Sequence, residues 1–202
     1  MDAPDPIEIE ASKAALRRAM AIRREEIDSL GASQAGTAMA DVLSERPEWD
    51  DARRVALFAS LPDEPDTRPI VRLAKAAGKQ VYLPRCTGDR GLEMLAVDDW
   101  SDLRVGRFGI LEPEEGGRGC SLADLDLILV PGVAFDFDGR RLGRGGGFYD
   151  RALSSLQGGA SPRLVGVGFA FQLVDRVPAE EHDCGVGAIL SERGWLESRA
   201  PR

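Results

Sequence analysis

The stretch "RLGRGGGFYDR", residues 141–151, combines residue types that bind phosphate groups. Three consecutive glycines, beginning at Gly145, let backbone N–H groups turn toward one concavity with no Cβ in the way. Arg141 and Arg144 add planar, permanently charged donors for phosphate oxygens. A helix is expected directly after the glycines, and its N-terminal N–H groups and dipole favour an anion there. The spacing therefore favours an anion-binding loop over a flexible connector.

Two common phosphate-binding motifs do not describe this loop. It lacks the G-x-x-x-x-G-K-[ST] order of a P-loop and contains no lysine. Gly143 and Gly145 form G-x-G, but Phe148 stands where a dinucleotide-binding fingerprint has its third glycine. A hairpin, not a bare strand, is also expected before it. Both motifs are excluded, while the physical requirements for binding phosphate remain met.

Two carboxylates are candidates for a metal site. Asp150 follows the glycines by about one helical turn, and Mg²⁺ usually takes one or two carboxylates together with phosphate oxygens and water. Asp183, in "EHDCG", is the second candidate. For Asp150, a helix-dipole partner or an ion pair with Arg151 is an equal alternative. His182 is the only histidine and no cysteine cluster accompanies it, so neither zinc nor a hydrolytic triad is indicated.

Three further charged residues could face a ligand. Glu64 lies in the loop "LPDEPDT" after the first expected strand, and ligands of open α/β sheets bind at the carboxyl ends of strands. Its alternative is a solvated or helix-capping charge. Lys13 and Arg17 are four residues apart, so both project from one face of an expected helix. Their alternative is a solvated helix face.

Composition sets the class of protein. The 202 residues are 43% hydrophobic and 30% charged, and we expect one domain over residues 1–202. The net charge of −8 disfavours nucleic acid or an anionic membrane as a partner. Three scattered cysteines suit a reducing compartment, and no apolar run approaches the roughly 20 residues of a membrane span. A cytoplasmic location is therefore expected.

The N-terminal part is expected to be helical. Residues 1–10 are predicted to be disordered. "SKAALRRAMAIRREEIDSL" has apolar residues near helical spacing, which predicts an amphipathic helix capped by Ser12 and ended by Gly31. A second helix is expected from about Ser33 to just before Pro47.

The remainder alternates between strands and helices. Strands are expected at 53–60 and 79–85 with a helix at 67–77 between them, the pattern of a parallel βαβ unit. Asp138-Gly139 predicts a hairpin turn, and "VGAIL", residues 186–190, is expected to be the last strand. The pattern predicts an α/β fold: a three-layer sandwich with a mostly parallel mixed sheet and an N-terminal helical pair.

The longest distinctive segments point to a known family. "PGVAFDFDGRRLGRGGGFYDR" followed by "FQLVDRVPAEEHD" closely resembles the 5-formyltetrahydrofolate cyclo-ligase family. "KAALR", "PDEPDT" and "GKQVYLPR" extend this resemblance upstream, so that it covers roughly Lys13 to Glu192. The resemblance implies an α/β sandwich around a mixed sheet. It also implies an enzyme that uses ATP and Mg²⁺ to convert 5-formyltetrahydrofolate into 5,10-methenyltetrahydrofolate through a phosphorylated formyl group.

The resemblance also implies roles for individual residues. Arg144 would be catalytic, lying between the γ-phosphate and the formyl oxygen. Asp150 and Asp183 would hold Mg²⁺. The implied ATP-binding residues are Lys13, Arg17, Arg141, Leu142, Gly143, Arg144, Gly145, Gly146, Gly147, Phe148 and Tyr149. The implied substrate-binding residues are Glu64, Arg144, Phe148 and Tyr149.

A few positions depart from the family pattern. Many relatives carry Tyr-Tyr-Asp where this chain has "FYD", so Phe148 lacks a hydroxyl. Gly187 stands where an acidic residue is common. The alternative to the enzyme is a non-catalytic folate-binding or regulatory relative with the same pocket. Another is a different enzyme on a similar fold that handles sugar phosphates or CoA. A monomer is expected.

Overall fold

The computed structural model describes residues 6–88, 90–156, 162–180 and 183–199. The expectation about residues 1–5 and the note on His182 lie outside this part of the chain. None of the helices in these ranges has both the length and the apolar character that crossing a bilayer requires.

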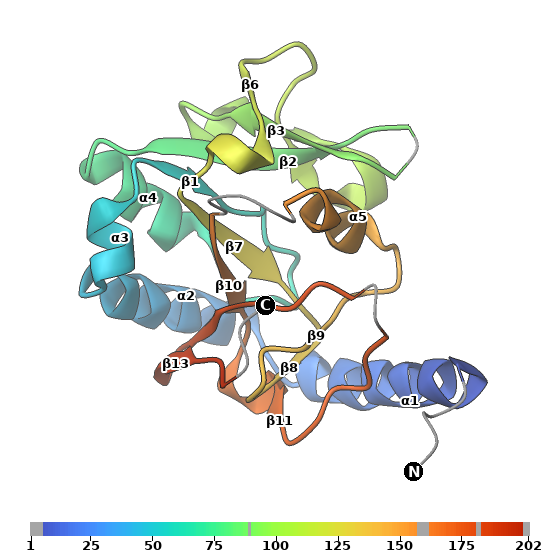
Figure 1. Cartoon of the computed structure of the whole chain (residues 1–202). Helices are drawn as coiled ribbons and strands as arrows, with labels where there is room; N and C mark the ends of the chain where they lie inside the picture. Colours follow the sequence, from blue (N-terminus) through green and yellow to red (C-terminus); the bar gives the residue numbers. More distant parts are fainter. Residues whose placement is uncertain (1–5, 89, 157–161, 181–182, 200–202) are drawn as a thin grey trace.

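A mixed eight-stranded sheet forms the centre of the molecule (Figure 1). Its order is β13 (Gly194–Glu197), β12 (Ala188–Ser191), β10 (Arg163–Val167), β7 (Leu127–Pro131), β1 (Arg54–Ala56), β2 (Gln80–Cys86), β3 (Leu92–Ala96) and β6 (Gly119–Cys120). The five strands from β12 to β2 are parallel, while β13, β3 and β6 pair antiparallel at the two edges. The predicted mostly parallel sheet and the βαβ unit are confirmed.

Two small sheets and short 3₁₀ helices complete the strand pattern. The first small sheet joins β11 (Leu173–Val174), β8 (Ala134–Asp136) and β9 (Arg141–Leu142), and the second joins β4 (Arg104–Val105) and β5 (Leu111–Glu112). The 3₁₀ helices are η1 (Trp100–Asp102), η2 (Arg107–Gly109), η3 (Leu122–Asp124) and η4 (Ala170–Gln172). β8 and β9 are antiparallel around Asp138 and Gly139, so the predicted hairpin is confirmed.

Helices cover both faces of the large sheet (Figure 1). α2 (Ser29–Ser44), α3 (Pro47–Asp51) and α4 (Arg68–Ala76) pack on one face, and α5 (Phe148–Ser154) packs on the other. Side chains of β1 alternate accordingly: Val55 belongs to the first apolar cluster and Ala56 to the second. These layers match the expected three-layer sandwich.

The N-terminal helix α1 (Pro6–Glu25) packs beside the small sheet rather than over the large one. Its Met20 shares an apolar cluster with Ala134 of β8 and Leu142 of β9. Figure 1 shows α1 running along one end of the molecule and extending past it. The helix thereby reaches the chain segments that precede and follow the glycine loop.

Three predicted boundaries are wrong. α1 begins at Pro6, not Ser12, so the predicted disorder does not hold from residue 6 onward. Proline suits the first turn of a helix, where its missing N–H is not needed. α2 already includes Gly31, because Asp28 caps it by accepting from the Gly31 N–H at 2.7 Å. At the other end of the chain, a further edge strand, β13, follows the predicted last strand.

Candidate active site

A cavity of about 430 Å³ opens at the carboxyl ends of the central strands. This is where an open α/β sheet binds its ligands. Its lining residues come from the loop after β1, from the ends of β2 and β7, from the first residue of β3, from the η2 segment, and from the glycine loop with the start of α5. They are Phe58, Leu61, Glu64, Pro84, Cys86, Leu92, Phe108, Pro131, Gly132, Arg141, Gly143, Arg144, Gly146, Gly147, Phe148, Tyr149 and Asp150.

The glycine loop needs its glycines for backbone geometry. Gly145 and Gly147 adopt φ values of +97° and +67°, in the region that side chains with a Cβ rarely enter. A Cβ on Gly146 would lie 2.8 Å from the ring of Phe148. Gly147 is also the N-cap of α5. The loop therefore presents its backbone to the cavity and leads straight into a helix, as the sequence predicted.

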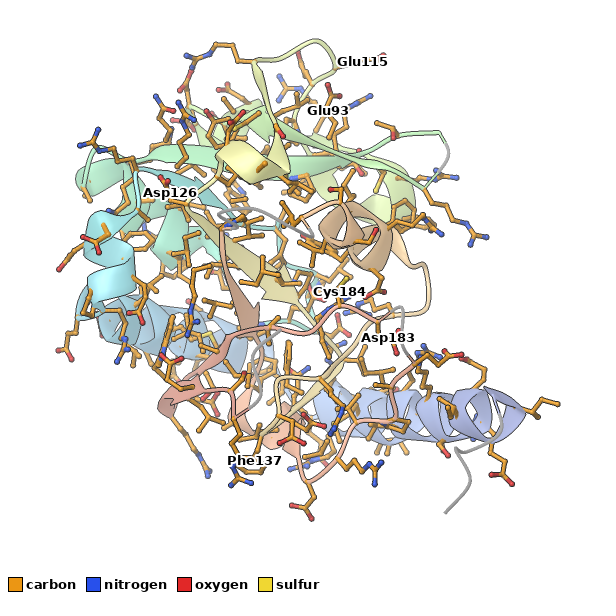
Figure 2. All side chains as sticks on the ribbon, in the orientation of Figure 1. Glu93, Glu115, Asp126, Phe137, Asp183 and Cys184 are labelled. Carbon is orange, nitrogen blue, oxygen red and sulfur yellow. The ribbon has the colours of Figure 1, made fainter. Side chains whose placement is uncertain are left out.

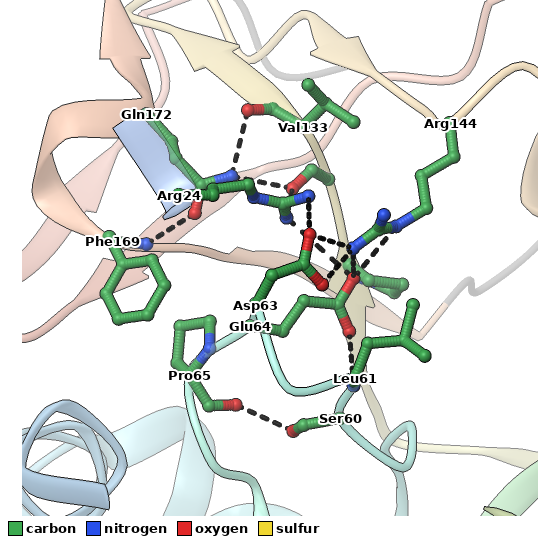
Figure 3. Close-up of polar contacts among 12 residues, drawn as sticks. Arg24, Ser60, Leu61, Asp63, Glu64, Pro65, Val133, Arg144, Phe169 and Gln172 are labelled. Carbon is green, nitrogen blue, oxygen red and sulfur yellow. Dashed lines mark hydrogen bonds and ion pairs between the residues drawn. The ribbon is translucent and has the colours of Figure 1, made fainter. Parts of the chain in front are cut away.

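The Glu64 loop is tied together internally, which directs this carboxylate inward (Figure 3). The hydroxyl of Ser60 donates to the backbone oxygen of Pro65 at 2.6 Å, and Thr67 donates to the backbone oxygen of Phe58 at 2.7 Å. The Leu61 N–H donates to Glu64 at 3.1 Å. Glu64 is buried, with 6% of its surface exposed. It is thus not the solvated loop charge that the sequence left open.

Four charged side chains meet beside this loop (Figure 3). Arg144 donates to Glu64 at 2.9 and 3.2 Å and to Asp63 at 2.8 and 3.0 Å. Arg24, near the end of α1, donates to Asp63 at 3.2 Å and to the backbone oxygen of Gly132 at 3.3 Å. We call these residues, Arg24, Asp63, Glu64 and Arg144, the four-charge cluster. It joins α1, the first βα loop and the glycine loop at one wall of the cavity.

Arg141 is buried rather than presented on the loop surface. It is 5% exposed and donates to Asp150 at 2.5 Å and to the backbone oxygen of Pro131 at 3.2 Å. Within the described residues, its Nε has no hydrogen-bond partner. The ion pair foreseen for Asp150 exists, but with Arg141 instead of Arg151, which donates to the backbone oxygen of Gly146. The pair fixes the start of α5 against β7.

The two basic residues of α1 reach different parts of the site. Arg17 donates to the backbone oxygen of Gly143 at 3.1 Å. Lys13 is buried and lies 2.6 Å from a carboxylate oxygen of Glu180 and 2.7 Å from one of Asp183. Burial alone would lower the pKa of Lys13, but hydrogen bonds with Asp183 and Glu180 raise it. The solvated alternative is therefore wrong for Lys13, which does not line the cavity in this structure.

The two candidate metal ligands lie on neighbouring segments. The Cys184 thiol donates to the backbone oxygen of Asp150 at 3.5 Å, which brings the 183–184 segment against the start of α5. Figure 2 shows Asp183 and Cys184 between α5 and α1. Asp150 and Asp183 each hold a cationic side chain, Arg141 and Lys13 respectively. In the described ranges, no group of three or more His, Cys, Asp or Glu side chains that could hold a metal ion by themselves is present.

Aromatic residues form part of the cavity wall. Phe148 meets Phe108 of η2 edge-on, with ring centroids 5.9 Å apart. The hydroxyl of Tyr149 is buried and, among the described residues, has no hydrogen-bond partner. Burial raises the pKa of Tyr149, so this hydroxyl stays protonated. Tyr149 lines the cavity, and a buried donor without a protein partner at such a residue is suited to a ligand.

Sequence reasoning named about half of the residues that line the cavity and missed the others. The lining residues that were not predicted are Phe58, Leu61, Pro84, Cys86, Leu92, Phe108, Pro131 and Gly132. Asp63 and Arg24 of the four-charge cluster were not predicted either. Asp63 adjoins Glu64 in the sequence, and that proximity was the only available signal. In contrast, Leu142 packs in the apolar cluster under α1 and its backbone pairs with β8, so its side chain faces away from the cavity.

The Gly187 departure has a local structural reason. A Cβ at Gly187 would lie 2.7 Å from a guanidinium nitrogen of Arg163. Arg163 instead donates to the backbone oxygen of Gly187 at 3.2 Å and pairs with Glu197. The space of a side chain at this position is therefore filled by Arg163.

Known proteins resemble the chain over most of its length. Residues 9–192 match the model of the 5-formyltetrahydrofolate cyclo-ligase family. The 5-formyltetrahydrofolate cyclo-ligase of Escherichia coli K12 is 39% identical over 143 residues, 69% of this chain and 78% of that protein. The mouse protein of the same name is 29% identical over 72% of this chain and 76% of its own length.

Solved structures give the same result. The 5,10-methenyltetrahydrofolate synthetase of Aquifex aeolicus superposes with a TM-score of 0.80 and 32% identity, over 94% of both chains. The synthetase of Mycoplasma pneumoniae, at 19% identity and a TM-score of 0.71 over 89% of this chain and 98% of its own, shares the fold. The resemblance seen in the sequence is confirmed.

Proposed function

The chain belongs to the 5-formyltetrahydrofolate cyclo-ligase family, and we propose that it converts 5-formyltetrahydrofolate into 5,10-methenyltetrahydrofolate, using ATP and Mg²⁺ and releasing ADP and phosphate. One observation carries this proposal. The glycine loop and the buried Glu64 carboxylate line the same cavity, and Arg144 bridges them. The glycine loop suits a phosphate group, and the Glu64 carboxylate suits the N–H groups of a heterocycle. Arg144 lies between the two, where its charge suits a phosphoryl group in transfer.

The folate half of the cavity is proposed to lie against Glu64. A pterin carries amino and ring N–H donors, and the buried Glu64 carboxylate is a matching acceptor. Phe108 and Phe148 provide flat apolar surface for an aromatic ring. The Tyr149 hydroxyl, which lacks a described protein partner, supplies one more polar contact.

The ATP half is proposed to lie along the glycine loop. Gly143, Gly146 and Gly147 line the cavity, and we assign their backbone N–H groups to the triphosphate oxygens. Arg17 adjoins this loop through the Gly143 carbonyl. Lys13 would serve the same phosphates only after leaving its carboxylate partners.

The chemistry of the donor set suits Mg²⁺. Asp150 and Asp183 offer hard carboxylate oxygens on adjacent segments, and two carboxylates leave the other positions to phosphate and water, which is how Mg²⁺ is usually held. When bound, Mg²⁺ would neutralise charge on the triphosphate. The described residues supply no larger set of ligands.

The reaction requires activation of a poor leaving group. The formyl oxygen of the folate attacks the γ-phosphorus of ATP, the bond to the β-phosphate oxygen breaks, and ADP leaves. N10 then attacks the formyl carbon and loses its proton, the ring closes, and phosphate departs with the formyl oxygen. Arg144 holds the developing charge on the phosphoryl group during both steps. No side chain acts as a covalent nucleophile.

An absorbance assay of the methenyl product tests the proposal. Protein, ATP, Mg²⁺ and 5-formyltetrahydrofolate should yield product, and omission of ATP should abolish it. Arg144→Ala should lower kcat far more than it raises the KM for ATP, because its contact strengthens in the transition state. Folate binding without any product would instead identify a non-catalytic relative. The expected cytoplasmic location, monomeric state and single-domain organisation stay predictions.

A further inference from the structure

A second guanidinium group lies behind Arg144 and contacts the same loop. Figure 3 shows Arg24 and Arg144 pointing toward the carboxylates of Asp63 and Glu64. Arg24 donates to Asp63 at 3.2 Å and lies 3.8 Å from Glu64. The family's glycine motif does not include Arg24, because it comes from α1 more than 100 residues earlier.

The two arginines are held very differently. The side chain of Arg24 is 4% exposed and is anchored to the backbone oxygen of Gly132, just after β7. Gln172 donates to the same oxygen at 2.8 Å, which holds that carbonyl in place. The side chain of Arg144 is 45% exposed and sits on the glycine loop. Arg24 is therefore the fixed partner of the carboxylates, and Arg144 is the one that can leave.

The charges of the four-charge cluster balance only while Arg144 stays. Two carboxylates face two guanidinium groups in this structure. Burial, and then the nearby charge of Arg144, lower the pKa of Arg24, which shows that the two cations repel each other. When Arg144 turns toward a phosphoryl group, this repulsion is relieved and Arg24 alone faces Asp63 and Glu64.

We propose that Arg24 is a positioning residue of the reaction, which keeps the Asp63 and Glu64 carboxylates in place after Arg144 leaves them for the phosphate. This role rests on the proposed function. Asp63, Glu64 and Arg24 together then carry one net negative charge, which favours binding of the N–H donors of a pterin at Glu64. Without Arg24, the two adjacent carboxylates would repel each other with no cation beside them, and Glu64 would lose its fixed position.

Three variants test this role by direct folate binding and by kinetics. Arg24→Gln should weaken 5-formyltetrahydrofolate binding, and raise its KM, by at least about tenfold, with a much smaller change in the KM for ATP. Arg24→Lys keeps the charge but loses the planar fork, so it should recover part of the loss. The control is Arg23→Gln, the same change at the exposed neighbouring residue, which contacts Phe171. It should bind folate as the wild type does.

A double mutant separates positioning from simple structural support. In an Arg24→Gln background, Asp63→Asn removes the surplus negative charge, so folate affinity should rise above that of Arg24→Gln alone. If Arg24 acted only through packing, the losses of folate affinity caused by Arg24→Gln alone and by Asp63→Asn alone would add in the double mutant. Unchanged folate affinity in Arg24→Gln, or additive losses, would overturn the proposal. If Arg24→Gln does not fold, as thermal unfolding would reveal, Arg24→Lys is compared with the wild type instead, and a folate affinity equal to that of the wild type would overturn the proposal. If the proposed function itself were wrong, the wild-type protein would form no methenyl product in the absorbance assay.

Discussion

The ammonium group of Lys13 lies 2.7 Å from a carboxylate oxygen of Asp183, although 170 residues separate the two in the sequence. One was expected to bind phosphate and the other to bind metal. In this structure they are partners, so the arrival of a metal–nucleotide complex would exchange their ion pair for contacts with its phosphates and cation. The N-terminal helix and the side chains of Glu180 and Asp183 are therefore expected to respond to ATP together.

Lys13→Met should lower both stability and nucleotide binding. Glu180 and Asp183 would lose a buried donor, which costs about 1–3 kcal/mol of unfolding free energy. The KM for ATP should rise, while the KM for folate should change little. The matched control is Lys75→Met, since Lys75 lies on α4 and only approaches Asp98 at 3.7 Å. Equal KM values for ATP in both variants would contradict a role for Lys13 in nucleotide binding.

The Lys13 ion pair should also make stability depend on pH. Its pKa is raised above 10.5 in the folded protein, so the stabilisation is complete below pH 10.5 and is lost as the pH rises through the raised value. Denaturant unfolding of the wild type and of Lys13→Met across the alkaline range measures this contribution. The difference between their unfolding free energies should shrink at the highest pH, and a constant difference would argue against the ion pair.

Two glycines with similar positive φ values allow a matched test of the glycine loop. Gly147 and Gly78 have φ values of +67° and +70°. Alanine at either position should cost about 1 kcal/mol of stability through strain in the left-handed region. Only Gly147→Ala should also weaken ATP binding, because only Gly147 lines the cavity. Titration with ATP and thermal unfolding distinguish the effects, and equal ATP affinities would remove the loop from the binding site.

Tyr149→Phe should separate ligand binding from folding. The buried hydroxyl has no described protein partner, so its removal should leave the unfolding free energy unchanged or slightly higher. Folate affinity should fall severalfold if the hydroxyl is reserved for the ligand. Tyr82→Phe is the control. The Tyr82 hydroxyl donates to Gln80 at 3.1 Å, and Tyr82 does not line the cavity. A clear loss of stability in Tyr149→Phe would indicate a structural role for the hydroxyl.

Cys86 offers a chemical probe of cavity occupancy. Burial, helped by a hydrogen bond with Glu112, raises the pKa of the Cys86 thiol to about 11. Alkylation by iodoacetamide should therefore be slow at pH 8 and should accelerate with rising pH, because the thiolate is the reactive form. Bound 5-formyltetrahydrofolate should slow it further, since Cys86 lines the cavity. Peptide mass spectrometry compares it with Cys120, which lies outside the cavity. A folate-independent rate at Cys86 would place the ligand elsewhere.

Local features of the site could be predicted from the sequence because they depend on neighbouring residues. Glycines at 145–147 indicated a backbone free of Cβ obstruction, and Gly145 and Gly147 do adopt positive φ values. Asp138-Gly139 indicated the hairpin that precedes this loop. The spacing of Lys13 and Arg17 placed both on one helix face. These inferences use geometry over a few residues, where chain conformation alone sets the outcome.

Capping and packing decided what local patterns left ambiguous. Gly31 looked like the end of a helix, yet Asp28 provides a side-chain cap that starts α2 before it. Gly187 looked like a missing carboxylate, yet the Arg163 guanidinium fills the space beside it. In both cases the outcome depends on a neighbouring side chain, Asp28 or Arg163, whose position only the folded chain defines.

By itself, the sequence determined the fold class, the family and the main chemical groups of the site, because strand and helix periodicity and the glycine motif are written in consecutive residues. The tertiary structure alone decided which charges meet. Arg24 reaches Asp63 and Lys13 reaches Asp183 because α1 packs beside β8 and β9, and Phe108 meets Phe148 because η2 lies against the glycine loop. These contacts join residues far apart in the chain, and the burial of Arg24 and Lys13 gives their ion pairs a strength that pairs of exposed charges lack.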